Sequence, residues 1–401
     1  MRPFAGTLPF DAAYRLVIEA GRPMAHTERI AVELADGRVL SAPIVADQDV
    51  PAFDRAAMDG YAVIAADTTA AAAGAPVALR QIGRVFTGET TGTALTSGTC
   101  IEVATGAPLP PGADAVVMVE HTARDGTLVL VQRPATPRQH VGPRGADIRQ
   151  GESLLEAGAV FTPARLGAVT AIGRTHVEVF ARPRVAIMCT GDEVVSPGTP
   201  LRPGQVYNVN RYTLEALVRR HGGEPVIIPT TGDSLDALDS SLATARTCDI
   251  IVTSGGSSVG EHDLVIDMVR THGEVIFHGI AIKPGKPTVF GRIGDALLLG
   301  LSGYPTSCLS NAHVLLVPLL RLIARLPAWT PRTLTLPLAR RLTSATGRMQ
   351  FYTVRIEDNT VVPAFKASGD ITSMAHADGY VVIPADDEAV EAGTMVEVKL
   401  Y

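Results

Sequence analysis

The stretch Ile250-Ile-Val-Thr-Ser-Gly-Gly-Ser-Ser-Val-Gly260 decides how the central part of this chain folds. Its first three residues are apolar and β-branched, which predicts a short strand buried within a sheet. Residues 264–271 then have the apolar spacing of a helix. The glycine-serine run between them permits a tight turn and leaves backbone N–H groups at the helix start, where they attract phosphate. A strand, a turn and a helix in this order are typical of one unit of a parallel sheet.

The same alternation continues on both sides of this stretch. Strand-like runs at 185–189 and 225–229 alternate with helical runs at 212–220 and 235–246. A long closing helix is expected over 305–326, with a kink at Pro318. We therefore predict a three-layer α/β domain with a mostly parallel sheet over residues 183–328.

The flanking segments predict a multidomain chain, since 401 residues exceed what one ordinary core supports. Short β-rich runs between Gly, Pro and Asp turns predict an inserted β-domain over 46–142. Similar runs predict a small C-terminal β-barrel over 329–401. Residues 1–45 and 143–182, with helical spacing at 10–20 and 163–172, predict a helical and extended linker domain.

Composition excludes several classes of function. The net charge of −6, with no basic run, argues against nucleic acid. The longest apolar run, 314–320, is too short to span a membrane, and the N-terminus lacks the pattern of a signal peptide. None of the four cysteines forms a C-x-x-C pair, so neither a disulfide framework nor a zinc knuckle is indicated. We expect a cytoplasmic protein whose partner is a small molecule or another protein.

Lysine is rare and clustered in this chain. Only four lysines occur, and Lys283 and Lys286 frame the sequence Lys-Pro-Gly-Lys. A compact, strongly hydrated ammonium suits phosphate or another oxyanion. With the glycine-serine run, these lysines predict an anion site built from Ser254, Gly255, Gly256, Ser257, Ser258, Gly260, Lys283 and Lys286. The run matches neither a Walker A loop nor a dinucleotide fingerprint, and a plain strand-to-helix turn is the alternative.

Four further stretches carry candidate groups. Thr190-Gly-Asp-Glu193 directly follows a predicted strand, where paired carboxylates could bind Mg²⁺ or simply form a turn. The stretch 58–62 around Asp59 has the composition of a turn. Thr105 lies in a proline-rich loop and could donate to an oxyanion, and Arg144-Gly-Ala-Asp147 could carry a ligand carboxylate. The histidines lack the spacing of a zinc site.

Taken together, these stretches resemble one family, the molybdopterin molybdenumtransferases of the MoeA and gephyrin E-domain type. The resemblance runs in family order over nearly the whole chain, and six motifs in order are highly specific. The matching stretches are 58–62, 105–108, 144–148, 190–193, 254–261 with Asp263, and 281–287.

The resemblance implies a transferase of molybdenum cofactor biosynthesis. Molybdate would be inserted into adenylylated molybdopterin with release of AMP, supported by Mg²⁺. It also implies an elongated homodimer, with each site between the α/β domain of one subunit and the β-domain of the other. A molybdopterin adenylyltransferase and molybdoenzyme-maturation proteins are the further partners it suggests.

Residue roles follow from the same resemblance. The glycine-serine run and the two lysines would hold the pterin and phosphate end. The metal or substrate carboxylates would be Glu193 and Asp263, with Asp233 as a further metal ligand. The other subunit would contribute Asp59, Thr105 and Asp147. A loop for the oxyanion would contain Ser302, Pro305 and Ser307.

This oxyanion loop departs from the family pattern. The family usually reads Pro-Gly-Asn-Pro-Val-Ser, whereas this chain reads Ser302-Gly-Tyr-Pro-Thr-Ser307. A smaller departure is Arg55-Ala56, where Asn-Ser is common. The loop leaves two alternatives open: a non-catalytic molybdopterin-binding carrier or scaffold, and a homologue that prefers tungstate. An adenylyltransferase is a third, because its fold resembles the α/β domain alone, but the β-domain argues against it.

Overall fold

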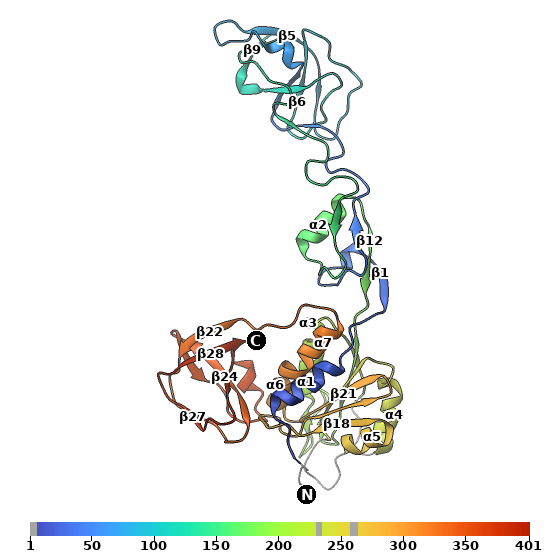
Figure 1. Cartoon of the computed structure of the whole chain (residues 1–401), viewed down its shortest axis with the longest axis vertical. Coiled ribbons are helices and arrows are strands. Elements are labelled where there is room, and N and C mark those ends of the chain that lie inside the picture. The colour runs from blue at the N-terminus through green and yellow to red at the C-terminus, as the bar shows by residue number, and fades with distance from the viewer. Residues whose placement is uncertain (1–5, 230–234, 257–263) are drawn as a thin grey trace. The chain divides into compact units, whose positions relative to one another are not determined.

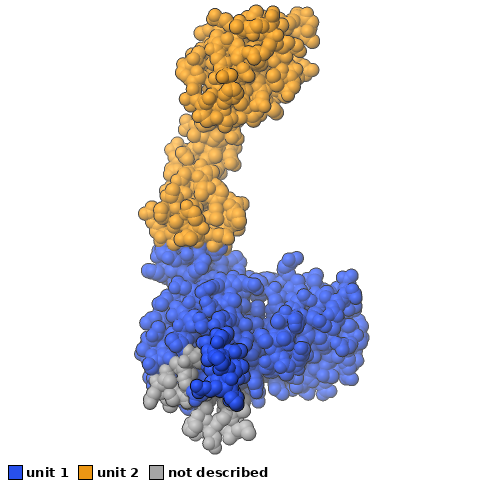
Figure 2. All heavy atoms as spheres, turned by 180° about the vertical axis from the view of Figure 1, so that it is seen from behind, with its two compact units in different colours: residues 1–28, 37–39, 179–401 blue, residues 29–36, 40–178 orange. Residues whose placement is uncertain are grey.

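The computed structural model describes residues 6–229, 235–256 and 264–401. The chain divides into two compact units, coloured separately in Figure 2. The first contains residues 1–28, 37–39 and 179–401, and the second contains residues 29–36 and 40–178. The predicted division into four domains is finer than these two units and remains a prediction.

A six-stranded sheet forms the centre of the first unit (Figure 1). Its strand order is β16-β13-β17-β21-β20-β18; the first four strands pair in parallel, and β20 pairs antiparallel with both β21 and β18. The mostly parallel sheet is thus confirmed. The bounds are β13 (Arg184–Cys189), β16 (Glu224–Ile227), β17 (Ile250–Ser254), β18 (Glu274–His278), β20 (Val289–Ile293) and β21 (Ala296–Leu301).

Helices cover both faces of this sheet, as the three-layer prediction requires. Alternate residues of each strand enter opposite cores: Ile187 packs with α1 (Phe10–Ala20), α3 (Val209–Arg220), α6 (Pro305–Asn311) and α7 (Val317–Ile323). Its neighbour Met188 packs with α4 (Leu235–Ala245) and α5 (Leu264–His272). Strands buried on both faces explain why their sequences are continuous apolar runs.

The long closing helix changes its winding just before its proline. Residues Pro305–Ile323 are helical, with a π-helical stretch at Ala312–Leu316 and Pro318 in the first turn of α7. Proline lacks the N–H of a regular turn and crowds the preceding carbonyls, so a wider turn accommodates it. The segment has the length and apolar composition of a membrane span, but 72% of its 18-residue window is buried in the unit. It is a core helix.

The C-terminal strands form a second six-stranded sheet as a half-barrel around their own core. One edge strand, β19 (Ile282–Lys283), comes from the predicted α/β segment and pairs parallel with β24. Thus a lysine of the predicted anion site belongs to the C-terminal sheet. The other elements are β22 (Thr333–Pro337), β24 (Met349–Glu357), β25 (Thr360–Pro363), β26 (Gly379–Ile383), β28 (Met395–Leu400), a small sheet of β23 (Leu342–Thr343) with β27 (Ala389–Val390), and α8 (Thr372–Ala375).

The second unit contains the predicted β-rich runs. They form a sheet of order β7-β4-β6-β5-β9-β8, with buried side chains on both of its faces. The bounds are β4 (Gly60–Val63), β5 (Val77–Val85), β6 (Thr99–Val103), β7 (Ala115–Met118), β8 (Thr122–Asp125) and β9 (Leu128–Val131).

Short pairs of strands and one helix make up the rest of this unit. Thr162 caps α2 (Pro163–Ala171) by accepting from the Arg165 N–H at 3.4 Å, and Pro163 suits the first turn. The pairs are β2 (Ile44–Val45) with β11 (Ser153–Leu155), and β3 (Arg55–Ala56) with β10 (Val141–Gly142). Strands β1 (Thr27–Ala31) and β12 (His176–Phe180) also pair, and both cross the boundary between the units.

Candidate functional site

The carboxyl ends of three adjacent parallel strands open into one cleft of the first unit. The loops after β13, β17 and β21 supply Thr190, Ser254 and Ser302 to a cleft of about 1470 Å³. Ligands bind at this edge of open α/β sheets, because the helices and loops that follow the strands diverge there. The structure therefore brings together three motifs that the sequence places more than 45 residues apart.

Hydrogen bonds tie the three loops to one another. The Thr190 N–H donates to the Ser254 carbonyl at 3.0 Å, and the Ser254 hydroxyl donates to the Ser302 carbonyl at 3.2 Å. The Asn210 amide, from α3, donates to the Ser254 hydroxyl at 2.7 Å and to the Gly303 carbonyl at 2.8 Å. One buried asparagine thus fixes two loops, which makes the floor of the cleft rigid.

Glycine is required where the loops approach most closely. Gly255 has φ +96°, and a Cβ there would lie 2.6 Å from the Thr190 carbonyl oxygen. Gly256 has φ +66°, a conformation that side chains disfavour. The described part of the predicted glycine-serine run therefore permits close backbone approach. Three of its predicted ligand residues, Ser257, Ser258 and Gly260, lie outside the described residues.

Two buried polar atoms of the cleft have no hydrogen-bond partner among the described residues. They are the Thr190 Oγ1 and the Asn210 Oδ1, and the two residues are 3% and 7% exposed. Buried polar groups are rarely left unpaired, so each such atom requires an explanation. Both residues line the cleft, so these two atoms are in place to accept a hydrogen bond from a polar ligand or, for the Thr190 hydroxyl, to donate one.

Lys283 and Lys286 line the same cleft, and hydrogen bonds from helix α6 hold their loop in place. The Asn311 amide of α6 donates to the Gly285 carbonyl at 3.1 Å and to the Thr288 hydroxyl at 2.9 Å. Gly285 has φ +103°, and a Cβ on it would lie 1.8 Å from the Asn311 Nδ2. The glycine between the lysines is therefore needed to seat the loop on α6.

The C-terminal domain adds residues that sequence reasoning missed. Arg348 lines the cleft and brings a third cationic side chain, and the loop containing Ser368 and Gly369 completes the wall. The Ser368 carbonyl accepts from the Thr306 N–H at 3.0 Å, which ties this loop to α6. No local pattern marks these residues, because only the pairing of β19 with β24 brings them to the lysines.

The predicted oxyanion loop also lies in the cleft. Ser302, Pro305 and Ser307 all line it. Of the residues that depart from the family pattern, Ser302 makes a local hydrogen bond: its Oγ accepts from the Tyr304 N–H at 3.2 Å, just before Pro305 begins α6. Tyr304 is largely exposed.

One of the predicted metal ligands lies in the described cleft. Glu193 lines it, with its carboxylate folded back over Gly191, whose φ is +135°. Asp263 and Asp233 fall outside the described residues, and within the described ranges no cluster of three or more His, Cys, Asp or Glu side chains could hold a metal. One carboxylate beside space for a phosphate still fits Mg²⁺, which keeps several waters and shares substrate oxygens.

The cleft cysteine is no nucleophile. Burial raises the pKa of Cys189 to about 11, so its thiol stays protonated at neutral pH. All four cysteines are buried and unpaired. Chemistry in this cleft therefore depends on hydroxyl, carboxylate and cationic groups.

In the second unit, Asp59 and Thr105 meet directly. The Asp59 Oδ1 accepts from the Thr105 N–H at 2.6 Å and from its hydroxyl at 2.9 Å. These two hydrogen bonds lower the pKa of Asp59, which keeps an exposed carboxylate charged. The two motifs are 46 residues apart in sequence, and the pairing of β4 with β6 unites them.

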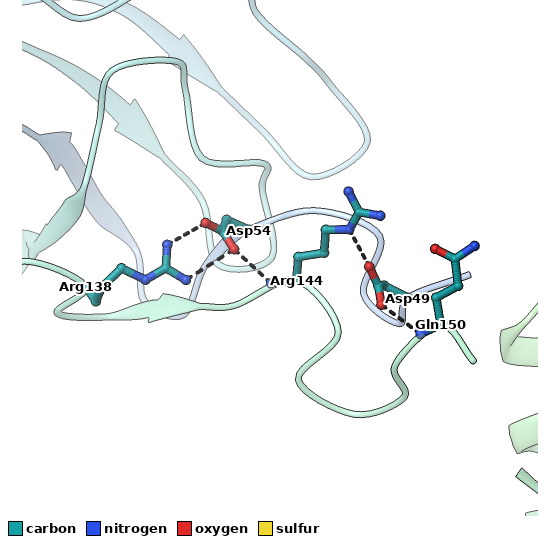
Figure 3. Close-up of polar contacts among 5 residues, drawn as sticks. All are labelled: Asp49, Asp54, Arg138, Arg144 and Gln150. Carbon is teal, nitrogen blue, oxygen red and sulfur yellow. Dashed lines mark hydrogen bonds and ion pairs between the residues drawn. The ribbon is translucent and has the colours of Figure 1, made fainter. Parts of the chain in front are cut away.

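Arg144 is engaged within its own unit (Figure 3). Its Nε donates to the Asp49 Oδ2 at 2.5 Å, and its backbone N–H donates to the Asp54 Oδ1 at 2.8 Å. The guanidinium is therefore already paired with a carboxylate of the chain. Asp147 lies in the following turn, where its N–H donates to the Val50 carbonyl at 3.0 Å.

Comparisons with known proteins agree with this architecture along the whole chain. Residues 8–173 match the MoeA N-terminal region (domain I and II), residues 186–322 a probable molybdopterin binding domain, and residues 335–401 the MoeA C-terminal region (domain IV). Molybdopterin molybdenumtransferase 2 of Mycobacterium tuberculosis is 36% identical, covering 91% of this chain and 92% of that protein. The chain belongs to the MoeA family of molybdopterin molybdenumtransferases.

Other members of the MoeA family show the same full-length likeness. The molybdopterin molybdenumtransferase of Haemophilus influenzae is 30% identical, covering 98% of each chain. The crystal structure of the molybdopterin biosynthesis MoeA protein from Pyrococcus horikoshii is 37% identical, with a TM-score of 0.85, covering 98% of this chain and 99% of that one. The family and the multidomain fold expected from the sequence are thus confirmed.

Proposed function

We propose that this chain is a molybdopterin molybdenumtransferase that inserts molybdate into adenylylated molybdopterin and releases AMP. The observation that carries the proposal is the convergence of three strand-end loops and three cationic side chains, Lys283, Lys286 and Arg348, in one cleft. A phosphorylated substrate and an oxyanion both need positive charge and backbone N–H groups, and this cleft provides them.

We assign separate roles in substrate binding and in catalysis to the described residues of the cleft. Lys283, Lys286 and Arg348 neutralise phosphate charge as the P–O bond to AMP breaks, and they orient the substrate against the rigid floor of the cleft. Thr190 and Asn210 would offer their buried side-chain oxygens to polar groups of the substrate. Ser302, Pro305 and Ser307 form the wall beside the lysines, where molybdate would bind.

Mg²⁺ is the metal we propose for this reaction. Glu193 would hold it together with substrate oxygens, and Asp263 and Asp233 are the further candidates. A bound Mg²⁺ supplies charge neutralisation at the phosphate oxygens. Glu193 lies in the loop after β13, so its carboxylate would place the metal ion at the carboxyl end of that strand.

We further propose a cytoplasmic homodimer in which Asp59, Thr105 and Asp147 of one subunit act on the substrate of the other. A charged carboxylate held by Thr105 suits positioning of a hydroxyl, a metal-bound water or a polar substrate group. Four buried free cysteines are in keeping with a reducing compartment. A molybdopterin adenylyltransferase and molybdoenzyme-maturation proteins are the partners we would test first.

The decisive experiment measures AMP release from adenylylated molybdopterin with Mg²⁺ and molybdate. We expect molybdate-dependent release by the wild type, and at least a hundredfold loss in Asp59→Ala and in Glu193→Ala while both variants remain folded at the assay temperature, on the scale of a lost electrostatic catalytic group. Asp47→Ala serves as the control, because Asp47 is exposed and forms a surface ion pair with Arg174 at 3.3 Å. Tight substrate binding without any AMP release would instead indicate the carrier or scaffold, and faster release with tungstate would indicate a tungstate-preferring enzyme.

A further inference from the structure

An exposed aromatic ring borders the cleft at Tyr304. This residue lines the cleft and is 65% exposed, compared with 8% for Ser302 and 41% for Tyr207, a second tyrosine that lines the cleft. An aromatic side chain at the rim of a binding cleft presents a flat apolar face to what binds there.

The backbone beneath this ring is rigid on both sides. The Tyr304 N–H donates to the Ser302 Oγ at 3.2 Å, and its carbonyl accepts from the Cys308 N–H at 2.8 Å. The preceding carbonyl, of Gly303, accepts from the buried Asn210 at 2.8 Å. The backbone that carries the ring is therefore held in place before a ligand binds.

A glycine lies beside the ring. A Cβ added to Gly369, in the loop of the C-terminal sheet that lines the cleft, would lie 3.7 Å from the Tyr304 Cδ1, which is ordinary van der Waals contact. The Gly369 position therefore presents backbone and no side chain toward this edge of the ring.

We propose that Tyr304 is a stacking platform for a flat heteroaromatic ring of the substrate, either the pterin or the adenine. Such rings stack on aromatic side chains, and the contact tolerates different ring systems because each has a π-face. This inference rests on the proposed function, since it assigns the substrate's ring to this wall. The cations of the cleft would then hold the phosphates that connect the two rings.

The test uses two separate probes, AMP and 6-hydroxymethylpterin, with dissociation constants measured by equilibrium dialysis on the full chain. Tyr304→Ala should weaken binding of the stacked probe about 5- to 150-fold, the range expected for loss of one stacked ring. Tyr304→Phe should keep it within about twofold, because the π-face remains. Tyr212→Ala is the matched control: Tyr212 is 45% exposed but does not line the cleft.

The outcomes separate the two rings and the two proposals. Weakening for AMP alone assigns the adenine to Tyr304, and weakening for the pterin alone assigns the pterin. Binding of neither probe by the wild type, or equal binding by the wild type and Tyr304→Ala, overturns the stacking role. AMP release from adenylylated molybdopterin is assayed in the same preparations, so an active wild type with an unaffected Tyr304→Ala refutes this inference and leaves the proposed function standing.

Discussion

Gly285 shows how one residue decides whether the two lysines are usable. Its φ of +103° is unfavourable for other residues, and a Cβ would overlap the Asn311 amide that anchors the loop. We expect Gly285→Ala to lower the free energy of unfolding by roughly 2–4 kcal/mol and to weaken AMP binding at least tenfold. Chemical denaturation and equilibrium dialysis measure these two effects.

The control for this substitution is Gly294→Ala. Gly294 also has a positive φ, +58°, but nothing lies within 4 Å of the position its Cβ would take. It should therefore show only the backbone cost, about 1 kcal/mol, and normal AMP binding. Equal losses in the two variants would mean that the contact with Asn311 is unimportant.

His221 makes the stability of the first unit depend on pH. It is buried with its ring edge against Trp329, at a centroid distance of 5.0 Å. Burial, with Arg321 and Arg220 nearby, lowers its pKa to about 4. The unfolded chain, with a pKa near 6.5, therefore binds a proton first, and the stability of the neutral form is lost as pH falls from about 6.5 toward 4.

We expect His221→Phe to remove this part of the pH dependence, since phenylalanine keeps the edge contact without titrating. Between pH 7 and pH 5 the wild type should lose about 1–2 kcal/mol more stability than the variant. Some slope persists in the variant, because burial also lowers the pKa of His313 to about 4. Parallel stability curves for the two proteins would contradict the assignment.

At the scale of elements, two aspartates hold together the segments on either side of the β-sheet of the second unit, which we call the neck. We define the neck as residues 46–54 and 138–151, the two segments that lead into and out of its β-sheet (Figure 3). Asp54 accepts from the Arg144 N–H at 2.8 Å and from the Arg138 guanidinium, and Asp49 accepts from the Gln150 N–H at 2.9 Å. These bonds lower the pKa of both aspartates.

We expect Asp54→Ala to loosen the neck without unfolding the sheet. Hydrogen exchange should accelerate in residues 46–54 and 138–151, and stability should fall by about 1–2 kcal/mol, since a charged partner of two segments is lost. Asp47→Ala, which removes an exposed pair with Arg174 at 3.3 Å, should leave exchange nearly unchanged. Exchange rates that respond equally in both variants would show that the neck does not depend on Asp54.

At the scale of the whole molecule, the proposed shared site can be tested by mixing inactive variants. Asp59→Ala and Glu193→Ala remove groups that we assign to opposite subunits, so a mixed dimer carries one intact site and one doubly altered site. Equal mixing and exchange should restore roughly a quarter of wild-type AMP release, because half of the dimers are mixed and each has half of its sites.

The mixing experiment can also contradict the shared site. Continued inactivity of the mixture, with light scattering showing that dimers have exchanged, would place both residues in the same subunit's site. A monomer in light scattering would exclude the shared site altogether. Mixing two preparations of Asp59→Ala provides the background, because no pairing of these chains creates an intact site.

The sequence by itself determined the elements and their order. Helices at residues 10–20 and 163–172 and the strand before the glycine-serine run form within one or two residues of their predicted positions. The β-rich runs also form strands, although β5 extends to Val85 and β24 begins at Met349, beyond the predicted runs. Each is encoded by local periodicity and by glycine or proline at its ends, and the ordered motifs were enough to indicate the family.

Only the tertiary structure decided which of these elements share a site. Strand β19, which contains Lys283, belongs to the C-terminal sheet and not to the α/β sheet. Its pairing with β24 places Lys283 in the same cleft as Arg348 and Ser368. The Asn210 amide holds two loops of the cleft, including Ser254, which lies 44 residues further along the chain. The Arg144 guanidinium is paired with Asp49, which lies 95 residues before it. Local sequence encodes backbone conformation, whereas these contacts depend on long-range pairing and on which buried polar groups find partners, and no single stretch of the chain carries that information.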